Sequence, residues 1–305
     1  MKNQIILAGG SGFIGQSLAP LLGADGYEVA VLTRSSSHHK GAVRYVQWNG
    51  KTIGEWSRLL EEAKAVVNLT GRSINCRHTP ANRREIIDSR VDSVRVLGQA
   101  VAGCRQPPRA FVQVSGIGIY GDTGDLWCDE NTPHGDDFLA DVCKLWEGAF
   151  DDVTASGMRK SILRIAPVLG PNGGFLKPLA RLTRWFAGGQ VGRGRQFVSW
   201  IHITDLAAMF VCAIERNDIV GIFNATSPNP VRNADFMGEL RQALHRPWSP
   251  PVPKWALPVG SWLMGTEASL ALTSCRAVPK YFIDSGFKFE FPELRAALAN
   301  IYPTR

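Results

Sequence analysis

The chain alternates between short apolar runs and longer stretches in which apolar residues recur every three or four positions. Apolar runs of about four to eight residues are typical of strands buried on both faces of a sheet, and the intervening pattern is typical of the helices that cover them. This rhythm predicts an α/β fold with a doubly wound parallel sheet. The apolar runs occupy residues 4–8, 28–33, 43–47, 65–69, 110–115 and 160–165.

The longest helical pattern lies between the fourth and fifth of these runs. From Arg83 to Ala102 the apolar residues fall on one face, which predicts a helix of about twenty residues. The apolar positions of this face are 86, 87, 91, 94, 97 and 101.

The regular alternation ends after residue 165. Prolines and glycines interrupt residues 167–174, a basic amphipathic stretch runs to Phe186, and residues 188–194 are rich in glycine. Five prolines between residues 246 and 258 exclude a regular helix or a central strand, and short helical patterns then resume up to about residue 300. These shifts predict a Rossmann domain followed by a smaller C-terminal α/β substrate subdomain. The first comprises residues 1–165 plus 195–227, and the second comprises residues 166–194 and 228–305.

The composition is that of a globular protein. Of the 305 residues 45% are hydrophobic and 20% are charged, which excludes disordered and fibrous classes. No apolar run reaches the roughly 18 residues that a membrane-spanning helix needs, and the first strand begins without room for a leader. We therefore expect a cytoplasmic protein with no membrane partner. The six cysteines have no paired spacing, so reduced thiols are expected.

The charge balance raises the question of nucleic-acid binding. The net charge is +7, but the 34 basic residues are dispersed, with no run of five or more. An anionic cofactor is a sufficient partner for this excess, so no nucleic-acid partner is expected. The six histidines lack the paired spacing of a metal site, and no metal is expected either.

A glycine-rich turn follows the first apolar run. Gly9, Gly12 and Gly15 are spaced three apart, and Phe13 and Ile14 begin the apolar face of a helix. Glycines at such a turn let backbone N–H groups approach a pyrophosphate that a side chain would block. The position after a strand and before a helix favours a dinucleotide clamp over a plain strand–helix turn.

The end of the second apolar run bears on which nicotinamide cofactor binds. An acidic residue about 20 positions beyond the glycines would bind the ribose 2′-hydroxyl of NAD, whereas an arginine there would pair with the 2′-phosphate of NADP. This chain has Thr33, Arg34 and Ser35, and no acidic residue lies between Glu28 and Glu55. The pattern favours NADP(H) over NAD; a surface arginine at a strand end is the alternative.

Five segments carry a family resemblance: GGSGFIG at 9–15, VVNLTG at 66–71, VQVSGIGIYG at 112–121, LRIAPVLGPNGG at 163–174 and SWIHITDLA at 199–207. In this order they resemble the extended short-chain dehydrogenase/reductase superfamily, the group of nucleotide-sugar epimerases and dehydratases. Within it the chain is similar to an atypical NAD(P)-dependent epimerase-like subfamily whose members end in a short C-terminal domain. The resemblance covers essentially the whole chain.

The resemblance implies further cofactor contacts. Leu69 and Thr70 are expected to border the adenosine ribose and the pyrophosphate, and Pro167 is expected beside the nicotinamide. Glu85 and Arg90 match helix positions near the cofactor, with a surface ion pair between helix residues as the alternative. A homodimer is common in the superfamily.

Catalysis is where the chain departs from this superfamily, whose enzymes typically combine a serine or threonine after the fifth strand with Y-x-x-x-K on the next helix. Ser115 and Lys144 occupy two of these positions, and Lys144 is expected to hold the nicotinamide ribose or to be a solvated surface group. Ala140 stands where the acid/base tyrosine belongs. Tyr120 is the candidate replacement, with a packing role as the alternative. Asp141 is expected to point away from Lys144.

Substrate contacts are expected after the irregular segment. Arg193 and Arg195 are candidates for binding an anionic substrate, with a solvated loop as the alternative. His202 is expected to be structural or to line the substrate site, and Asp205 to cap the helix that follows.

These expectations lead to one main function and two alternatives. The main one is an NADP(H)-dependent oxidoreductase or epimerase that acts on a small hydroxyl or carbonyl substrate, which the resemblance implies could be linked to a nucleotide. The absence of a tyrosine at position 140 favours a second reading, a catalytically silent NADP(H)-binding sensor or regulatory protein. A nucleic-acid-binding or structural role is the more distant third.

Overall fold

Eight strands form the central sheet, in the order β12-β8-β6-β5-β1-β2-β4-β3. Neighbouring strands are parallel except at one edge, where β3 is antiparallel to β4. The computed structural model describes residues 3–171, 173–253, 255 and 267–303. The strands of the sheet are β1 (Gln4–Ala8), β2 (Glu28–Thr33), β3 (His38–Lys40), β4 (Val43–Gln47), β5 (Ala65–Asn68), β6 (Ala110–Gly116), β8 (Arg159–Ile165) and β12 (Gly221–Ala225).

The predicted α/β class and doubly wound sheet are confirmed. Each of the six apolar runs forms a strand of this sheet, with ends that differ from the prediction by at most one residue. Two edge strands, β3 and β12, were not predicted, because β3 is polar and exposed throughout and β12 contains only a short apolar stretch.

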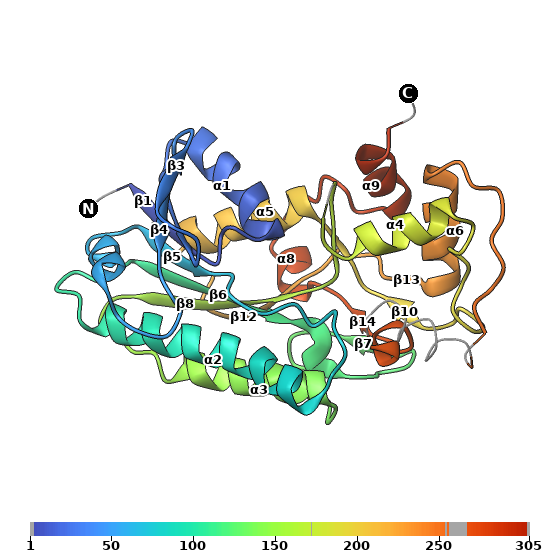
Figure 1. The fold of residues 1–305 in the computed structure, drawn as a ribbon, viewed down its shortest axis with the longest axis horizontal. Helices are drawn as coiled ribbons and strands as arrows, with labels where there is room; N and C mark the ends of the chain where they lie inside the picture. The colour runs from blue at the N-terminus through green and yellow to red at the C-terminus, as the bar shows by residue number, and fades with distance from the viewer. Residues whose placement is uncertain (1–2, 172, 254, 256–266, 304–305) are drawn as a thin grey trace.

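Helices cover both faces of the sheet. In Figure 1, α1 and α5 lie on one face and α2 and α3 on the other. The predicted long helix is present and begins three residues earlier, because Thr79 caps it and Pro80 occupies its first turn. The helices are α1 (Phe13–Ala24), α2 (Pro80–Ala102), α3 (Phe138–Asp151), α4 (Leu176–Arg184), α5 (Ile203–Glu215), α6 (Asn233–Ala243), α8 (Lys280–Asp284) and α9 (Leu294–Ile301), with short 3₁₀ turns at η1 (Glu55–Leu60), η2 (Ile117–Tyr120) and η4 (Ala268–Ala271).

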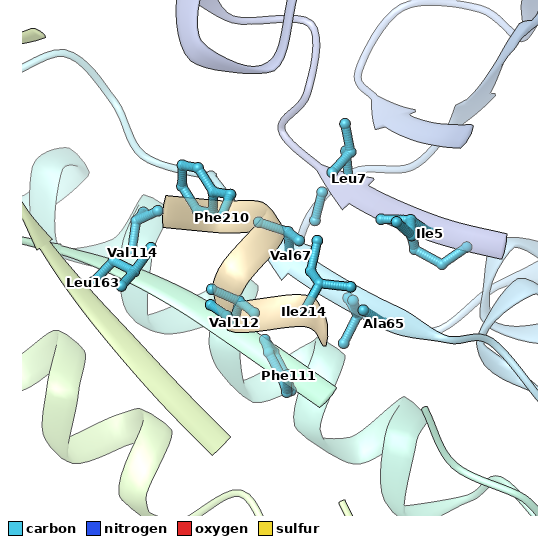
Figure 2. Close-up of a cluster of buried hydrophobic side chains, with 14 of the residues drawn as sticks. Ile5, Leu7, Ala65, Val67, Phe111, Val112, Val114, Leu163, Phe210 and Ile214 are labelled. Atoms are coloured by element: carbon cyan, nitrogen blue, oxygen red, sulfur yellow. The ribbon is translucent and has the colours of Figure 1, made fainter. Parts of the chain in front are cut away.

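The larger hydrophobic core lies between the sheet and these helices. Figure 2 shows Phe210 and Ile214 of α5 over apolar side chains of β5 and β6, and all of them are buried. Because the central strands are covered on both faces, their side chains are apolar at successive positions rather than alternating.

A second core lies beyond the carboxyl ends of the strands, where α4, α6 and α9 pack together around buried Trp200 and Phe236. Phe282 of α8 belongs instead to the larger core, beside β12, although the predicted boundary places residues 228–305 in the smaller subdomain. Short strand pairs accompany these helices: β10 (Phe197–Val198) with β13 (Val231–Arg232), β9 (Val168–Leu169) with β11 (Ile201–His202), and β7 (Trp127–Cys128) with β14 (Arg276–Ala277).

The proline-rich segment is irregular where it is described. Residues 246–253 form no helix, and their one sheet-like contact is a bridge between Val252 and Val191. The remainder of the predicted proline-rich stretch, residues 254 and 256–258, lies outside the described residues. Within the described part of the chain, no helix is long and apolar enough to cross a membrane.

Candidate functional site

The glycine turn that joins β1 to α1 has no room for a Cβ at Gly9 or at Gly15. Gly9 has a left-handed backbone (φ 73°), and a Cβ there would lie 2.9 Å from atoms of Thr70. A Cβ on Gly15 would lie 2.3 Å from the Cα of Gly10. Since real Cβ atoms do not approach backbone atoms so closely, this packing requires glycine at both positions.

The start of α1 presents free backbone donors. Gly12 is the N-cap and has no side chain to satisfy them, and the first turn of the helix contains no acidic residue. The first N–H groups of a helix have no partners within it, and the helix dipole makes this end positive. The turn therefore suits a pyrophosphate, which the backbone of Phe13, Ile14 and Gly15 can approach.

The ring of Phe13 has a further role. A Cβ added to Gly173 would lie 2.2 Å from this ring, and one added to Gly170 or Gly174 would lie within 3 Å of it. The loop after β9 thus rests on the first residue of α1, and its glycines make this contact possible.

The end of β2 places an unpaired cation beside a hollow. Thr33 is buried and its hydroxyl accepts a hydrogen bond from the Ser35 backbone (3.3 Å), whereas the Arg34 side chain is exposed. Arg34 makes no ion pair with any residue that the structure describes. It borders a hollow of about 420 Å³ that is otherwise lined by Gln47, Trp48, Asn49, Thr52, Ile53, Gly54 and Trp56.

The end of β5 closes the other side of the glycine turn. The Leu69 backbone donates to the Ala8 carbonyl (2.8 Å), and the Asn68 amide oxygen accepts from the Thr70 backbone (3.1 Å). The Thr70 hydroxyl is buried against Gly9 and has no hydrogen-bond partner among the described residues. A buried hydroxyl without a partner is unfavourable, so this atom is available to a ligand at the turn.

Glu85 and Arg90 do not pair with one another. Glu85 is exposed and forms an ion pair with Arg72. Arg90 is buried, donates to the carbonyls of Arg72 (3.0 Å) and Ile86 (2.9 Å), and lies over the ring of Trp146. Burial lowers the pKa of Arg90 to about 10. The alternative of an ion pair between these two helix residues is therefore wrong, and Arg90 supports the loop that follows Thr70.

Ser115 is the expected polar group at the end of β6. Its side chain is 5% exposed, and its hydroxyl makes no hydrogen bond within residues 3–171, 173–253, 255 and 267–303. α3 packs on this strand through Cys143, whose thiol donates to the Gly116 carbonyl (3.6 Å) and lies close enough to Ser115 for that hydroxyl to affect its pKa. Burial nevertheless raises the pKa of Cys143 overall. Ala140 is fully buried.

Tyr120 is not free to act as a proton donor. Its hydroxyl donates to the Asn224 side chain (2.8 Å) and accepts from Arg164 (3.1 Å), and the residue is 2% exposed. Burial raises the pKa of Tyr120 to about 12, despite the opposing effect of Arg164. These contacts favour the packing alternative for Tyr120, because both hydrogen-bonding directions of its hydroxyl are used inside the protein.

A buried ion pair organises this region, and sequence reasoning missed it. Arg164 of β8 binds Glu147 of α3 at two points, Nε to Oε1 (2.9 Å) and Nη2 to Oε2 (2.8 Å). Nη2 also contacts His134 (3.0 Å). Both partners of the pair are almost completely buried.

Lys144 lies half exposed on α3. Its ammonium forms an ion pair with Asp141 (2.7 Å) and donates to the Gly135 carbonyl (3.2 Å). The expectation that Asp141 points away from Lys144 is wrong, because residues three apart on a helix are neighbours. In this position Lys144 ties α3 to the loop before it.

His202 is placed as the structural alternative predicts. It is 1% exposed, its Nδ1 accepts from the Thr204 backbone (3.2 Å) at the start of α5, and its ring packs on Phe291 (4.1 Å between centroids). Burial lowers the pKa of His202 to about 4, more than a contact with Asn300 raises it. These contacts favour the structural alternative for His202.

Asp205 lies inside the first turn of α5 rather than at its N-cap. Its carboxylate accepts hydrogen bonds from the backbone of Glu290 (2.7 Å) and Phe291 (3.1 Å). His202 and Asp205 together fasten the C-terminal segment to α5. Pro167, half-buried after β8, accepts a hydrogen bond from Ile201 at its carbonyl (3.1 Å).

Arg193 and Arg195 are exposed on the loop before β10. Beside them lies a cation–π stack that the sequence analysis did not identify. In it Arg232 lies over Phe197 (3.9 Å), and Arg276 lies between Phe197 (4.3 Å) and Trp127 (3.5 Å). Asp125 pairs with Arg232 (2.6 Å), and this hydrogen bond lowers the pKa of Asp125. No short-range spacing could reveal the stack, because its members come from distant segments.

The described residues contain no group of three metal-ligating side chains.

Comparison with known proteins defines the class. Residues 5–225 match the NAD dependent epimerase/dehydratase family, and residues 252–301 match a domain of unknown function, DUF1731. Since the first match spans most of the chain, the protein belongs to the NAD dependent epimerase/dehydratase family. It is similar to epimerase family protein YfhF of Bacillus subtilis (34% identity; 99% of this chain and 98% of YfhF) and to the chloroplastic SDR39U1 homolog of Arabidopsis thaliana (34%; 97% and 86%).

Solved structures give the same picture. The chain is similar to human epimerase family protein SDR39U1, isoform 2, whose crystal structure contains NADPH: the TM-score is 0.87 at 30% identity, covering 99% of this chain and all of that one. It is also similar to a nucleoside-diphosphate sugar epimerase from Corynebacterium glutamicum (TM-score 0.79, 30% identity), covering 99% of this chain and 58% of that chain. These similarities confirm the Rossmann fold.

Proposed function

We propose that the protein is an NADP(H)-dependent, epimerase-like oxidoreductase acting on a small hydroxyl or carbonyl substrate. The observation that carries the cofactor assignment is Arg34, an exposed cation without an ion-pair partner in the described chain. It follows the carboxyl end of β2, and the glycine turn follows the carboxyl end of the neighbouring parallel strand β1. An arginine there pairs with a 2′-phosphate through charge-assisted hydrogen bonds. The NADPH in the human SDR39U1 structure supports the choice.

The residues present fit such a cofactor. The turn at Gly9, Gly12 and Gly15 and the unpartnered Thr70 hydroxyl would hold the pyrophosphate, and Leu69 would border the adenosine ribose. By the family resemblance, Lys144 and Pro167 would lie toward the nicotinamide. When bound, the cofactor supplies or accepts a hydride.

Ser115 would orient the substrate. Its buried hydroxyl, with no partner in the described chain, can donate a hydrogen bond to a carbonyl oxygen and stabilise negative charge that develops there. The proton itself would come from water, because Tyr120 is held by Arg164 and Asn224 and position 140 is alanine. Arg193 and Arg195 would attract an anionic substrate from solvent.

Fluorescence titration with NADPH and NADH tests the cofactor assignment. Arg34→Glu is expected to weaken NADPH binding about tenfold to a hundredfold and to leave NADH binding nearly unchanged. Arg44→Glu, an equal charge change at an exposed residue of β4, is the matched control. Equal affinity of the wild type for both cofactors would reject the NADP(H) assignment.

A catalytically silent NADP(H)-binding protein is the second candidate, and Ala140 is the observation in its favour. A panel of carbonyl substrates separates the two. An enzyme should show NADPH oxidation that Ser115→Ala lowers about a hundredfold, as expected when one oxyanion donor is lost. NADPH binding without turnover of any substrate would support the silent protein.

A further inference from the structure

The basic amphipathic stretch that ends at Phe186 has no part in the proposed chemistry. The C-terminal ends of α4 and α6 meet at the end of the molecule remote from β1 (Figure 1). We call this region the tip and define it as residues 183–192 and 245–252.

The two segments of the tip are firmly joined. The Val252 backbone donates to the Gln190 carbonyl (2.8 Å) and accepts from the Gly192 backbone (2.8 Å). The Arg246 side chain donates to the Arg184 carbonyl (3.2 Å). Side chains on either segment are therefore presented from one well-connected structure.

Large aromatic side chains project from the tip. Trp185 is 80% exposed, Trp248 is 64% exposed and Phe186 is 49% exposed. Phe186 has a left-handed backbone (φ 59°), as does His245 across the tip (φ 54°). Such conformations are strained for bulky residues and occur most often at functional sites. Exposed tryptophans on a strained turn indicate a binding surface rather than incomplete packing.

The surroundings of the tip are basic. Lys177, Arg181 and Arg184 follow one another at four- and three-residue spacings, so they form one exposed stripe on α4, beside its buried face. Trp185 comes directly after the stripe. In the sequence, no acidic residue occurs between Asp152 and Asp205 or between Glu239 and Glu267. Both segments of the tip are thus free of negative charge.

We propose that the tip and the basic stripe of α4 bind the surface of a membrane containing anionic lipids. Tryptophan is favoured at the head-group level because its ring is apolar and its N–H is polar, and lysine and arginine bind lipid phosphates. Such binding requires no spanning helix.

A membrane surface fits the tip better than a nucleic acid does. Proteins that bind single strands use a basic groove lined by stacking aromatic residues. The hollow beside the end of α6 has a volume of about 350 Å³ and is lined by Gly238, Arg241, Gln242, His245, Arg246 and Pro247. Neither Trp185 nor Trp248 lines it. The aromatic residues therefore stand outside the hollow, where they can enter a lipid head-group layer.

Vesicle sedimentation tests the proposal. The protein should bind phosphatidylcholine vesicles that contain phosphatidylglycerol, bind pure phosphatidylcholine weakly, and dissociate as salt is raised. Lys177→Glu with Arg181→Glu should lower the partition coefficient at least about thirtyfold, since each basic residue near the surface contributes about a fivefold effect. Trp185→Ser with Trp248→Ser should lower it as well, without removing the salt dependence.

Matched variants keep the test specific. Arg84→Glu with Arg95→Glu changes the net charge equally on exposed positions of α2, and Leu126→Ser removes an exposed apolar side chain elsewhere. Both should bind vesicles like the wild type, and thermal melting should show every variant folded. Equal loss of binding in the control and tip variants would overturn the proposal. Absence of vesicle binding by the wild type would also overturn it. Loss of self-association or of RNA binding in the tip variants would then identify a different partner for the tip.

Discussion

Arg164 and Glu147 face one another inside the protein and bind through two parallel hydrogen bonds of 2.9 and 2.8 Å. The same guanidinium donates to the Tyr120 hydroxyl, so one arginine connects β8, α3 and the turn after β6. The polar groups near Ala140 thus bind one another, and neither Glu147 nor Tyr120 is left as a free acid.

Breaking this pair should be strongly destabilising. Glu147→Gln leaves the charge of Arg164 buried without a counter-charge, and we expect the free energy of unfolding to fall by about 3–5 kcal/mol. Urea denaturation measures the change. Asp284→Asn, which breaks the exposed pair with Lys280, is the control and should leave the urea midpoint unchanged. Similar effects of the two substitutions would contradict the role assigned to the buried pair.

The glycine turn allows a comparison of two substitutions at the ends of one helix. Gly15→Ala should abolish NADPH binding and destabilise the fold, because its Cβ would collide with Gly10. Gly23→Ala, near the end of α1, meets no atom within 4 Å and should stabilise the protein by about 0.5–1 kcal/mol. Thermal unfolding and cofactor titration check both. Retained NADPH affinity in Gly15→Ala would refute the proposed clamp.

Tyr120→Phe distinguishes a structural from a catalytic hydroxyl. The substitution leaves Asn224 and one N–H of Arg164 without their buried partner, so the free energy of unfolding should fall by about 1–3 kcal/mol. The Tyr120→Phe protein that remains folded should show the same NADPH-dependent turnover as the wild type. A variant with wild-type stability and no turnover would instead support a catalytic role for the Tyr120 hydroxyl.

His202 should contribute a pH dependence to stability. Its pKa is lowered from 6.5 to about 4 by burial, so the folded protein binds fewer protons at this group than the unfolded chain between these values. The contribution of neutral His202 is present above pH 6.5 and is lost as the pH falls toward 4. His202→Asn, which keeps an acceptor for the helix N-terminus, should reduce this acid sensitivity in urea titrations. His39→Asn, at an exposed site, should leave it unchanged.

The sequence predicts the parts of the site whose causes are local. The turn at Gly9–Gly15 depends on close approaches within a few residues, apart from Thr70, and the six buried strands are apolar runs. The unusual residue at position 140 is visible because the family resemblance supplies the Y-x-x-x-K spacing in which Lys144 is kept. Arg34 could be identified because the residue about 20 positions beyond the glycines, at the end of the second strand, is the one expected to meet the ribose of the cofactor.

Contacts between distant segments could not be predicted in this way. Tyr120 is held by Arg164 and Asn224, whose positions depend on the pairing of three strands. The substrate-lining alternative for His202 stayed open because nothing in its own segment shows that Phe291 covers it. The error over Asp141 and Lys144 has a different cause, since their three-residue spacing already allows an ion pair.

The contact of Phe13 with the loop after β9 has a consequence for how such chains can diverge. Phe13 begins the helix of the glycine turn, and its ring fills the space that Cβ atoms at Gly170, Gly173 and Gly174 would need. A mutation to a bulkier residue at any of these glycines therefore becomes acceptable only after the ring has become smaller. We expect aligned relatives to exchange positions 13 and 173 together, because the three nearest atoms to a Cβ at Gly173 all belong to Phe13, whereas Gly174 also has a left-handed backbone and meets the Val168 carbonyl.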